Sequence, residues 1–197
     1  MFLDHNLQES LTLAKLEHAI CIISFVALFL NLQEIKFLFL GEANLEGFEK
    51  LQYVTFPKLQ ILNIPCQCPK HEYLIRFLEN NGKNLKEFYT SENNNALTLS
   101  IAKLCPNLKN LFIIFNEDEL NILKTIFGSC QYLESISFWC GKRFLDEKEL
   151  LETVAKFSPK NFYELKIYNC SHSELLPEEL ESFFISWESR TPKSHLI

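Results

Sequence analysis

One short phrase of alternating residue types recurs six times along this chain. Each copy has an apolar residue, two variable residues, an apolar residue, one variable residue and a final position that is apolar in five copies and Thr90 in the third. The copies begin at Leu32, Leu59, Leu85, Leu108, Leu133 and Phe162. Successive starts are 27, 26, 23, 25 and 29 residues apart. A period of this length predicts stacked repeat units rather than one closed core.

The end of each phrase has the period of a β-strand. Apolar and variable residues alternate there, so one set points into a core and the other points outward. Strands are therefore predicted near residues 34–38, 61–65, 87–91, 110–114, 135–139 and 164–168.

The intervals between the phrases have the period of an amphipathic helix, with apolar residues three and four positions apart. The sets are Tyr73, Leu74, Phe77 and Leu78; Leu97, Ile101 and Leu104; Leu120, Leu123, Ile126 and Phe127; Leu150, Leu151, Val154 and Phe157; and Leu180, Phe183, Phe184 and Trp187. Asn93–Asn95, Asn116 and Pro177 suit helix starts, and Gly82 and Gly128 suit helix ends.

A strand and a helix in every repeat predict an α/β solenoid with a parallel sheet on the concave side and helices on the convex side. Residues 1–197 show no linker or change of composition, so one domain is expected. The residues before Asn31 are expected to supply one earlier helix. The ends look unusual for a solenoid, because the Ala19–Leu30 run and His195-Leu196-Ile197 are apolar where polar caps are expected.

Composition narrows the choice of partner and compartment. The formal net charge is −6 and no basic stripe is visible, which argues against nucleic acid. The most apolar run, Ala19–Leu30, is shorter than the roughly 20 residues that a membrane span needs. The chain shows no targeting segment, so a cytoplasmic or nuclear location is expected. An odd number of cysteines, seven, argues against a disulfide framework and for buried structural thiols.

Two repeat openings contain cysteine, Leu104-Cys105-Pro106-Asn107-Leu108 and Ser129-Cys130-Gln131-Tyr132-Leu133, and Cys140 and Cys170 follow their strands. In these features the chain resembles the ribonuclease-inhibitor-like leucine-rich repeats, and among them the cysteine-containing type of F-box proteins. The resemblance implies a right-handed horseshoe. It also implies repeats that select substrates for a cullin ubiquitin ligase. Leu176-Pro177-Glu178-Glu179-Leu180 resembles an F-box opening, but it lies where a repeat helix is expected, and no F-box is recognised.

The outward strand positions are the candidate site, because solenoids bind partners on the concave surface. Tyr89, Phe112, Ile114, Trp139 and Tyr168 are predicted to form one exposed patch, and aromatic residues dominate binding hot spots. The alternative is a register shift of one residue, which would bury these side chains. The complete candidate set is Glu87, Tyr89, Asn110, Phe112, Ile114, Ser137, Trp139, Lys166 and Tyr168.

Signals of catalysis and of metal binding are absent from the sequence. It has no Gly-rich phosphate loop, no Gly-x-Ser-x-Gly and no His-Glu-x-x-His. Cys66-Gln-Cys68 with His71 lacks the second ligand pair of a structural zinc site, and Cys170 with His172 lacks an orienting third group. A non-enzymatic protein without cofactor or metal is therefore expected.

These features predict a protein-interaction module that binds a protein partner on its concave sheet. Substrate recognition for an F-box-type ubiquitin ligase is the finer form of this hypothesis. The alternative hypothesis is a structural repeat protein that self-associates through its apolar ends.

Overall fold

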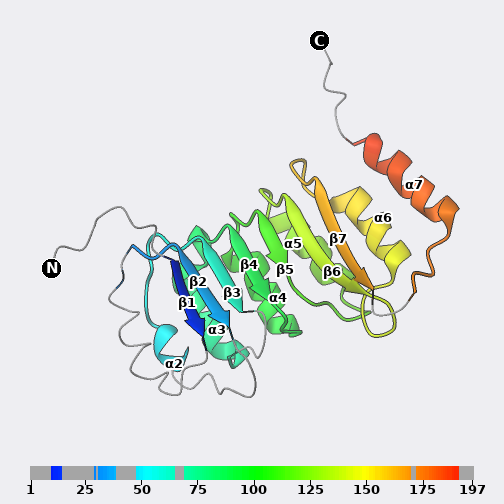
Figure 1. The fold of residues 1–197 in the computed structure, drawn as a ribbon. Coiled ribbons are helices and arrows are strands. Elements are labelled where there is room, and N and C mark those ends of the chain that lie inside the picture. Colours follow the sequence, from blue (N-terminus) through cyan, green and yellow to red (C-terminus); the bar gives the residue numbers. More distant parts are fainter. Residues whose placement is uncertain are drawn as a thin grey trace, which may run out of the picture.

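The computed structural model describes residues 10–14, 29, 31–38, 48–64, 69–169 and 172–190. Within them, seven strands form one parallel sheet in chain order, β1 to β7 (Figure 1). The strands are β1 Ser10–Ala14, β2 Glu34–Leu38, β3 Ile61–Ile64, β4 Glu87–Thr90, β5 Asn110–Phe112, β6 Ser135–Cys140 and β7 Glu164–Asn169. Each strand therefore pairs with the strands of the neighbouring repeats.

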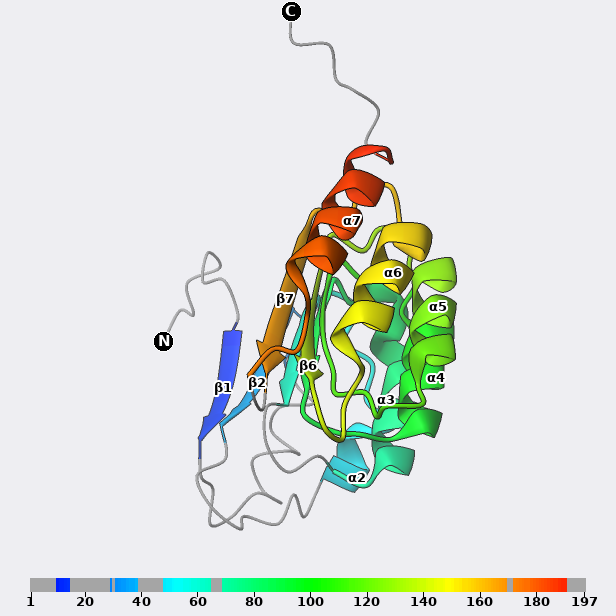
Figure 2. The same cartoon turned by 90° about the vertical axis from the view of Figure 1, so that its right-hand side faces the viewer.

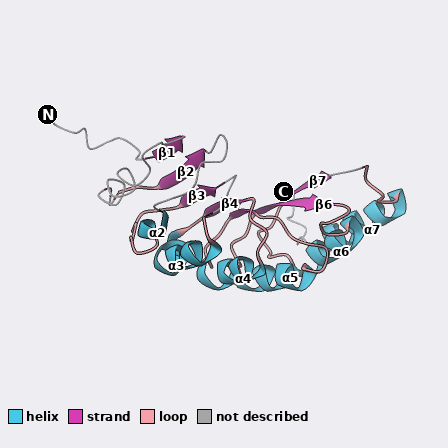
Figure 3. Ribbon diagram, turned by 90° about the horizontal axis from the view of Figure 1, so that it is seen from below, coloured by secondary structure: helices cyan, strands magenta, loops and turns pink. Residues whose placement is uncertain are grey.

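The helices form a second layer on one face of this sheet. They are α2 Phe48–Leu51, α3 His71–Asn81, the 3-10 turn η1 Gly82–Asn84, α4 Asn95–Leu104, α5 Leu120–Ser129, α6 Glu147–Phe157 and α7 Pro177–Glu188. Figure 2 shows the two layers, and Figure 3 shows that the strands lie on the inner side of an arc and the helices on its outer side. The chain folds as a leucine-rich-repeat solenoid.

The repeat phrase builds the core between the two layers. Leu59, Leu85, Leu108 and Leu133, which open four of the phrases, are all 0% exposed. The second apolar position of each phrase forms a continuous column across β2 to β6, because the register pairs the residues of adjacent strands. That column is Ile35, Leu62, Phe88, Leu111 and Ile136. Each such side chain contributes about 1.5–3 kcal/mol through burial, so stacking repeats is what stabilises any one of them.

The predicted strands are confirmed, with small differences in length. β5 ends at Phe112 rather than at residue 114, so Ile114 lies in the loop that follows. Before Asn31 the structure has a strand that the sequence did not predict, β1, and the helix expected there falls on residues outside the described ones. Most of the Ala19–Leu30 run and all of His195-Leu196-Ile197 lie outside the described residues.

The predicted helix boundaries are confirmed at most positions. The Asn94 side chain accepts a hydrogen bond from the Leu97 N–H at 3.0 Å, as an N-cap does, and Pro177 is the first residue of α7. The helix start predicted at Asn116 was wrong by three residues, because Glu119 directly precedes α5. The Glu119 carboxylate is buried and accepts from the Asn116 N–H at 2.8 Å, so it closes this turn instead of facing solvent.

Three of the seven cysteines are described, and Cys105, Cys130 and Cys140 are buried thiols outside any disulfide. The Cys130 Sγ donates to the Cys105 carbonyl at 3.4 Å, one repeat away. Burial raises the pKa of the Cys130 thiol to about 12, so it packs as a neutral group. Cys21, Cys66, Cys68 and Cys170 lie outside the described residues.

Two searches over the described part of the chain bear on metal and membrane binding. Residues there include no group of three or more His, Cys, Asp or Glu side chains able to hold a metal ion. None of the described helices is long and apolar enough to span a bilayer.

Gly82 packs directly against the following repeat. A methyl group added to it would lie 2.8 Å from the Leu104 carbonyl oxygen and 2.9 Å from Cys105 Sγ. We therefore expect Gly82→Ala to lower the free energy of unfolding by about 1–3 kcal/mol through overpacking. Gly128→Ala is the matched control, because a methyl group there has no neighbour within 4 Å. In α5 it is expected to stabilise the fold by about 0.5–1 kcal/mol. Urea unfolding of both variants is the measurement, and shifts in the same direction would contradict this packing.

Candidate interaction site on the concave sheet

Strand register gathers most of the predicted site residues into short rows on the concave face. Tyr89 pairs with Phe112, Phe112 with Ser137, and Ser137 with Lys166. A second row joins Trp139 to Tyr168, and a third runs from Glu87 through Asn110 to Ser135 and Glu164. Residues from four repeats therefore share one surface.

Four aromatic rings form a continuous group on this surface, and we call Phe112, Trp139, Phe144 and Tyr168 the aromatic cluster. The ring centroids of Trp139 and Tyr168 are 5.5 Å apart, and those of Phe112 and Tyr168 are 6.4 Å apart. The Phe144 ring lies 6.3 Å from Trp139. Tyr168 is 44% exposed and the Phe112 and Trp139 side chains are half-buried, so the cluster remains accessible. Phe112 and Trp139 thus lie outside the buried core, although they are half-buried and not fully exposed as the patch was predicted to be.

A tight turn after β6 brings Phe144 to the cluster. Gly141 has a φ of 91° and Lys142 a φ of 45°, which is the left-handed region where glycine is favoured. The Phe144 N–H donates to the Gly141 carbonyl at 3.0 Å and closes the turn. Sequence reasoning missed Phe144 because it lies in a loop and outside the strand alternation. The Gly141 in the sequence was the one signal of a turn at this place.

One serine on β6 lies between Phe112 and the β7 strand. Ser137 pairs with Phe112 on β5, and its small side chain leaves room above β6 for the Phe112 ring to reach Tyr168 on β7. Ser135 and Ser137 are only 6% and 9% exposed. Ser137 is thus on the predicted face but beneath its surface, and the expectation that it lies exposed there was wrong.

The other predicted residues surround the aromatic cluster or lie beside it. Lys166 is exposed, and Glu87, Tyr89 and Asn110 are half-buried on the strands. Ile114 is half-buried in the loop after β5, so it does not belong to the strand rows.

Polar groups beside the cluster are held by hydrogen bonds. The Ser135 hydroxyl donates to Glu164 Oε2 at 2.6 Å, and Lys166 Nζ lies 2.9 Å from the same oxygen. The hydrogen bond from Ser135 has the larger effect and the contact with Lys166 the smaller. Together they hold the pKa of the Glu164 carboxyl below its ordinary value. The surface therefore presents an ionised carboxylate and an ammonium next to the rings.

The Tyr89 phenol is expected to titrate well above its ordinary range. Its hydroxyl donates to Glu87 Oε2 at 3.1 Å. The pKa of Tyr89 is raised to about 12, and burial is the largest cause. The charge of Glu87, the hydrogen bond to Glu87 and the charge of Glu164 follow in that order. The raised pKa means that the folded chain favours the neutral phenol. The contribution of Tyr89 to the stability of the fold is therefore complete below pH 10 and is lost as the pH rises through about 12.

Ultraviolet titration of tyrosinate, with the Tyr89→Phe curve subtracted, measures this directly. The difference curve should have its midpoint near pH 12, and Glu87→Gln should move it downward because that variant removes the neighbouring charge. A midpoint at 10 in both proteins would contradict the contact.

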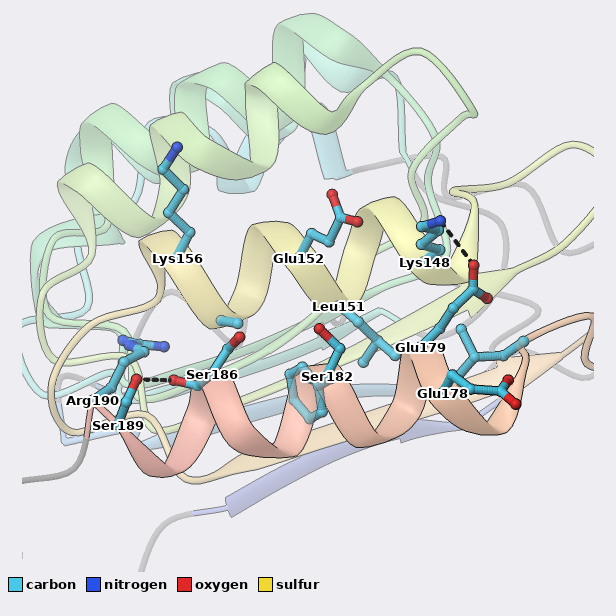
Figure 4. A pocket seen from close by; sticks show the side chains of 13 residues that line it. Lys148, Leu151, Glu152, Lys156, Glu178, Glu179, Ser182, Ser186, Ser189 and Arg190 are labelled. Carbon is cyan, nitrogen blue, oxygen red and sulfur yellow. Dashed lines mark hydrogen bonds and ion pairs between the residues drawn. The ribbon is translucent and has the colours of Figure 1, made fainter.

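A separate hollow lies between α6 and α7, near the C-terminal end of the solenoid (Figure 4). Its volume is about 750 Å³, and Ser182 and Ser186 point into it from α7. Lys148 Nζ pairs with Glu179 at 2.8 Å at one end. At the other end, Arg190 donates to the Val154 carbonyl at 2.8 Å and to both oxygens of Ser158. These contacts join α7 to α6, so the charged groups at both ends already have partners within the chain.

Comparison with known proteins assigns no family to this chain. No protein-family model matches the chain, and no curated protein is significantly similar to it. Among solved structures, the chain is similar to the leucine-rich repeat-containing protein LegL7 from Legionella pneumophila, at 10% sequence identity and a TM-score of 0.46. The match covers 93% of this chain and 73% of that one. The fold assignment rests on the repeat phrase and on the parallel register of β1 to β7, and it does not depend on this likeness.

Proposed function

We propose that this chain is a protein-interaction module that binds a protein partner through the aromatic cluster on its concave sheet. The observation that carries the proposal is a continuous series of ring contacts. Its four rings come from three strands and one turn, and they stay partly accessible. A contiguous apolar surface of this kind marks an interaction site more often than chance. Tyrosine and tryptophan rings anchor interfaces because they bury a large area at little cost in conformational entropy.

The polar groups around the rings support the same proposal. Protein interfaces place an apolar centre inside a polar rim. Here Lys166, Glu164 and the Glu87–Tyr89 pair border the aromatic cluster. A partner that offers an apolar anchor flanked by hydrogen-bonding groups fits this arrangement.

Affinity capture from cell extract tests the proposal. Quantitative mass spectrometry compares the wild-type chain with Phe112→Ala/Trp139→Ala. Loss of two anchor rings is expected to weaken the binding of a partner on the concave sheet by about 2 kcal/mol or more. This corresponds to a roughly 30-fold higher dissociation constant. The control is Leu99→Ala/Phe157→Ala, which removes exposed apolar side chains from the convex helices. Equal recovery of every bound protein by the two double variants would refute a concave site.

The finer proposal is substrate recognition for an F-box-type ubiquitin ligase, and it is supported by the cysteine-containing repeat openings. The segment that resembles an F-box opening, Leu176 to Phe184, is in and directly before α7. If the chain serves such a ligase, the cullin adaptor should be recovered together with the concave partner. Recovery of the partner without ligase components would leave a plain interaction module.

Self-association is the second candidate function, and the C-terminal end of the solenoid favours it. Within the described residues β7 pairs only with β6, and α7 exposes Leu180, Phe184 and Ile185 at 39%, 57% and 64%. Sheet edges and apolar helix faces of this kind promote pairing between copies. Sedimentation equilibrium distinguishes the candidates, because a mass independent of concentration excludes self-association.

A further inference from the structure

The turns that lead into β3, β4 and β5 stack into a regular ridge at the start of the strands. The Lys86 N–H donates to the Gln60 carbonyl at 2.8 Å, and the Lys109 N–H donates to the Lys86 carbonyl at 2.7 Å. The side chains of Asn84 and Asn107 reinforce this stacking, because each donates to a carbonyl of the preceding turn, at 3.2 Å and 2.8 Å. Equivalent side chains therefore recur about every 5 Å along the ridge, which is the spacing of the strands.

Four lysines from three successive turns line one shallow groove on this ridge, and we call Lys58, Lys83, Lys86 and Lys109 the basic groove. Its volume is about 390 Å³, and its remaining lining is Pro57, Gln60, Asn84, Asn107 and Tyr132. The lining contains no acidic residue, although the chain as a whole has a formal charge of −6. In the sequence Lys58, the Lys83/Lys86 pair and Lys109 lie in three different repeats, which is why no basic stripe is visible there.

One end of the groove already holds a carboxylate of the chain itself. Glu134, in the next turn, places Oε1 2.6 Å from Lys109 Nζ. Lys58, Lys83 and Lys86 are exposed, and no carboxylate of the described residues forms an ion pair with any of them. The Lys109–Glu134 pair is therefore an example of a carboxylate bound at this groove. The ammonium groups of Lys58, Lys83 and Lys86 remain available to bind others. Tyr132, 57% exposed, lies beside this end as an apolar contact.

We propose that the basic groove binds a short acidic peptide segment of a protein partner, with its side-chain carboxylates on Lys58, Lys83 and Lys86. The charge of the groove selects an anionic ligand. A nucleic acid fits less well, because the net negative charge of the chain repels a long polyanion. The groove also contains no arginine, the residue that recognises phosphate in a bidentate manner. Three turns span roughly 10 Å, which matches three or four residues of extended peptide.

Fluorescence anisotropy with a labelled peptide of alternating glutamate and serine tests this proposal. The double variant Lys83→Glu/Lys86→Glu should weaken binding roughly 10-fold or more, because two attractive contacts become repulsive. The control Lys50→Glu/Lys103→Glu makes the same change of net charge on exposed residues of α2 and α4. It should weaken binding less than about 3-fold, because neither residue lines the groove and exposed charges outside it are screened at ordinary ionic strength.

Three results would overturn the proposal. The first is the absence of salt-sensitive binding of the acidic peptide to the wild-type chain. The second is equal weakening by the groove variant and its control, which would mean that only net charge matters. The third is tighter binding of a single-stranded oligonucleotide of equal charge. The aromatic-cluster variant Phe112→Ala/Trp139→Ala should bind the acidic peptide as the wild type does, so this test and the test of the concave site fail independently.

Discussion

Replacing Phe77 with alanine is expected to lower the free energy of unfolding by about 3–5 kcal/mol. Phe77 is in α3, and its side chain is 0% exposed. Its ring lies 5.7 Å from that of Phe48 in α2 and 6.1 Å from that of Phe56, and the Phe48 ring lies 5.7 Å from Phe37 on β2. Removal of this ring leaves a cavity at the junction of two repeats, and neighbouring repeats cannot move to fill it while the sheet stays paired.

Urea unfolding followed by far-ultraviolet circular dichroism measures this effect. Tyr53→Ala is the control, because Tyr53 is close to α3 in space but 70% exposed. It is expected to change stability by no more than about 0.5 kcal/mol. Equal effects of the two variants would mean that the ring packing around Phe77 does not stabilise the fold.

The positions of six strands were predictable from the sequence because each has both a repeated phrase and strand alternation. Ser10–Ala14 was missed, although Leu11 and Leu13 alternate with polar residues there. The register pairs Ser10 with Glu34, so the repeat's first apolar position falls on Gln8. Without that leucine the phrase is incomplete, and the more apolar run after it favoured a helix.

The candidate site was only partly predictable, since alternation gives the face of a residue but not its depth. Phe112, Trp139 and Tyr168 were assigned to the concave side, and the structure places their rings in contact. Ser137 has the same alternation, yet it is buried because its neighbours on both sides are large. Depth depends on residues one strand away, and those are about 25 positions distant in the sequence.

The same reason explains the groups that sequence reasoning did not find. Phe144 reaches Trp139 by a turn with positive φ angles, and the sequence before a glycine does not fix the direction of such a turn. Lys58, Lys83 and Lys109 become neighbours only when three repeats stack. Surfaces that are assembled across repeats need the register, whereas the core of each repeat does not.

Asn81→Leu is expected to destabilise the chain by about 2–4 kcal/mol, although leucine is similar in size and more apolar. The Asn81 side chain is 0% exposed. Its Oδ1 accepts from the Phe56 N–H at 2.6 Å, and its Nδ2 donates to the carbonyls of Val54 at 2.8 Å and Phe77 at 3.0 Å. Leucine would leave the buried Phe56 N–H and the partly buried Val54 carbonyl without their amide partner, and a buried polar group left so costs about 1–3 kcal/mol.

Asn84→Ala is the matched control for Asn81→Leu, because it removes an amide that also donates to a backbone carbonyl of the same loop. The Asn84 Nδ2 lies 3.2 Å from the Pro57 carbonyl in an exposed position, where water replaces the lost bond. We expect this control to cost no more than about 0.5–1 kcal/mol by thermal or urea unfolding. If the two variants destabilise equally, burial of the Asn81 amide is not what holds the 52–57 loop against α3. A large difference between them would show that one buried side chain stands in for the backbone pairing that an irregular loop cannot make.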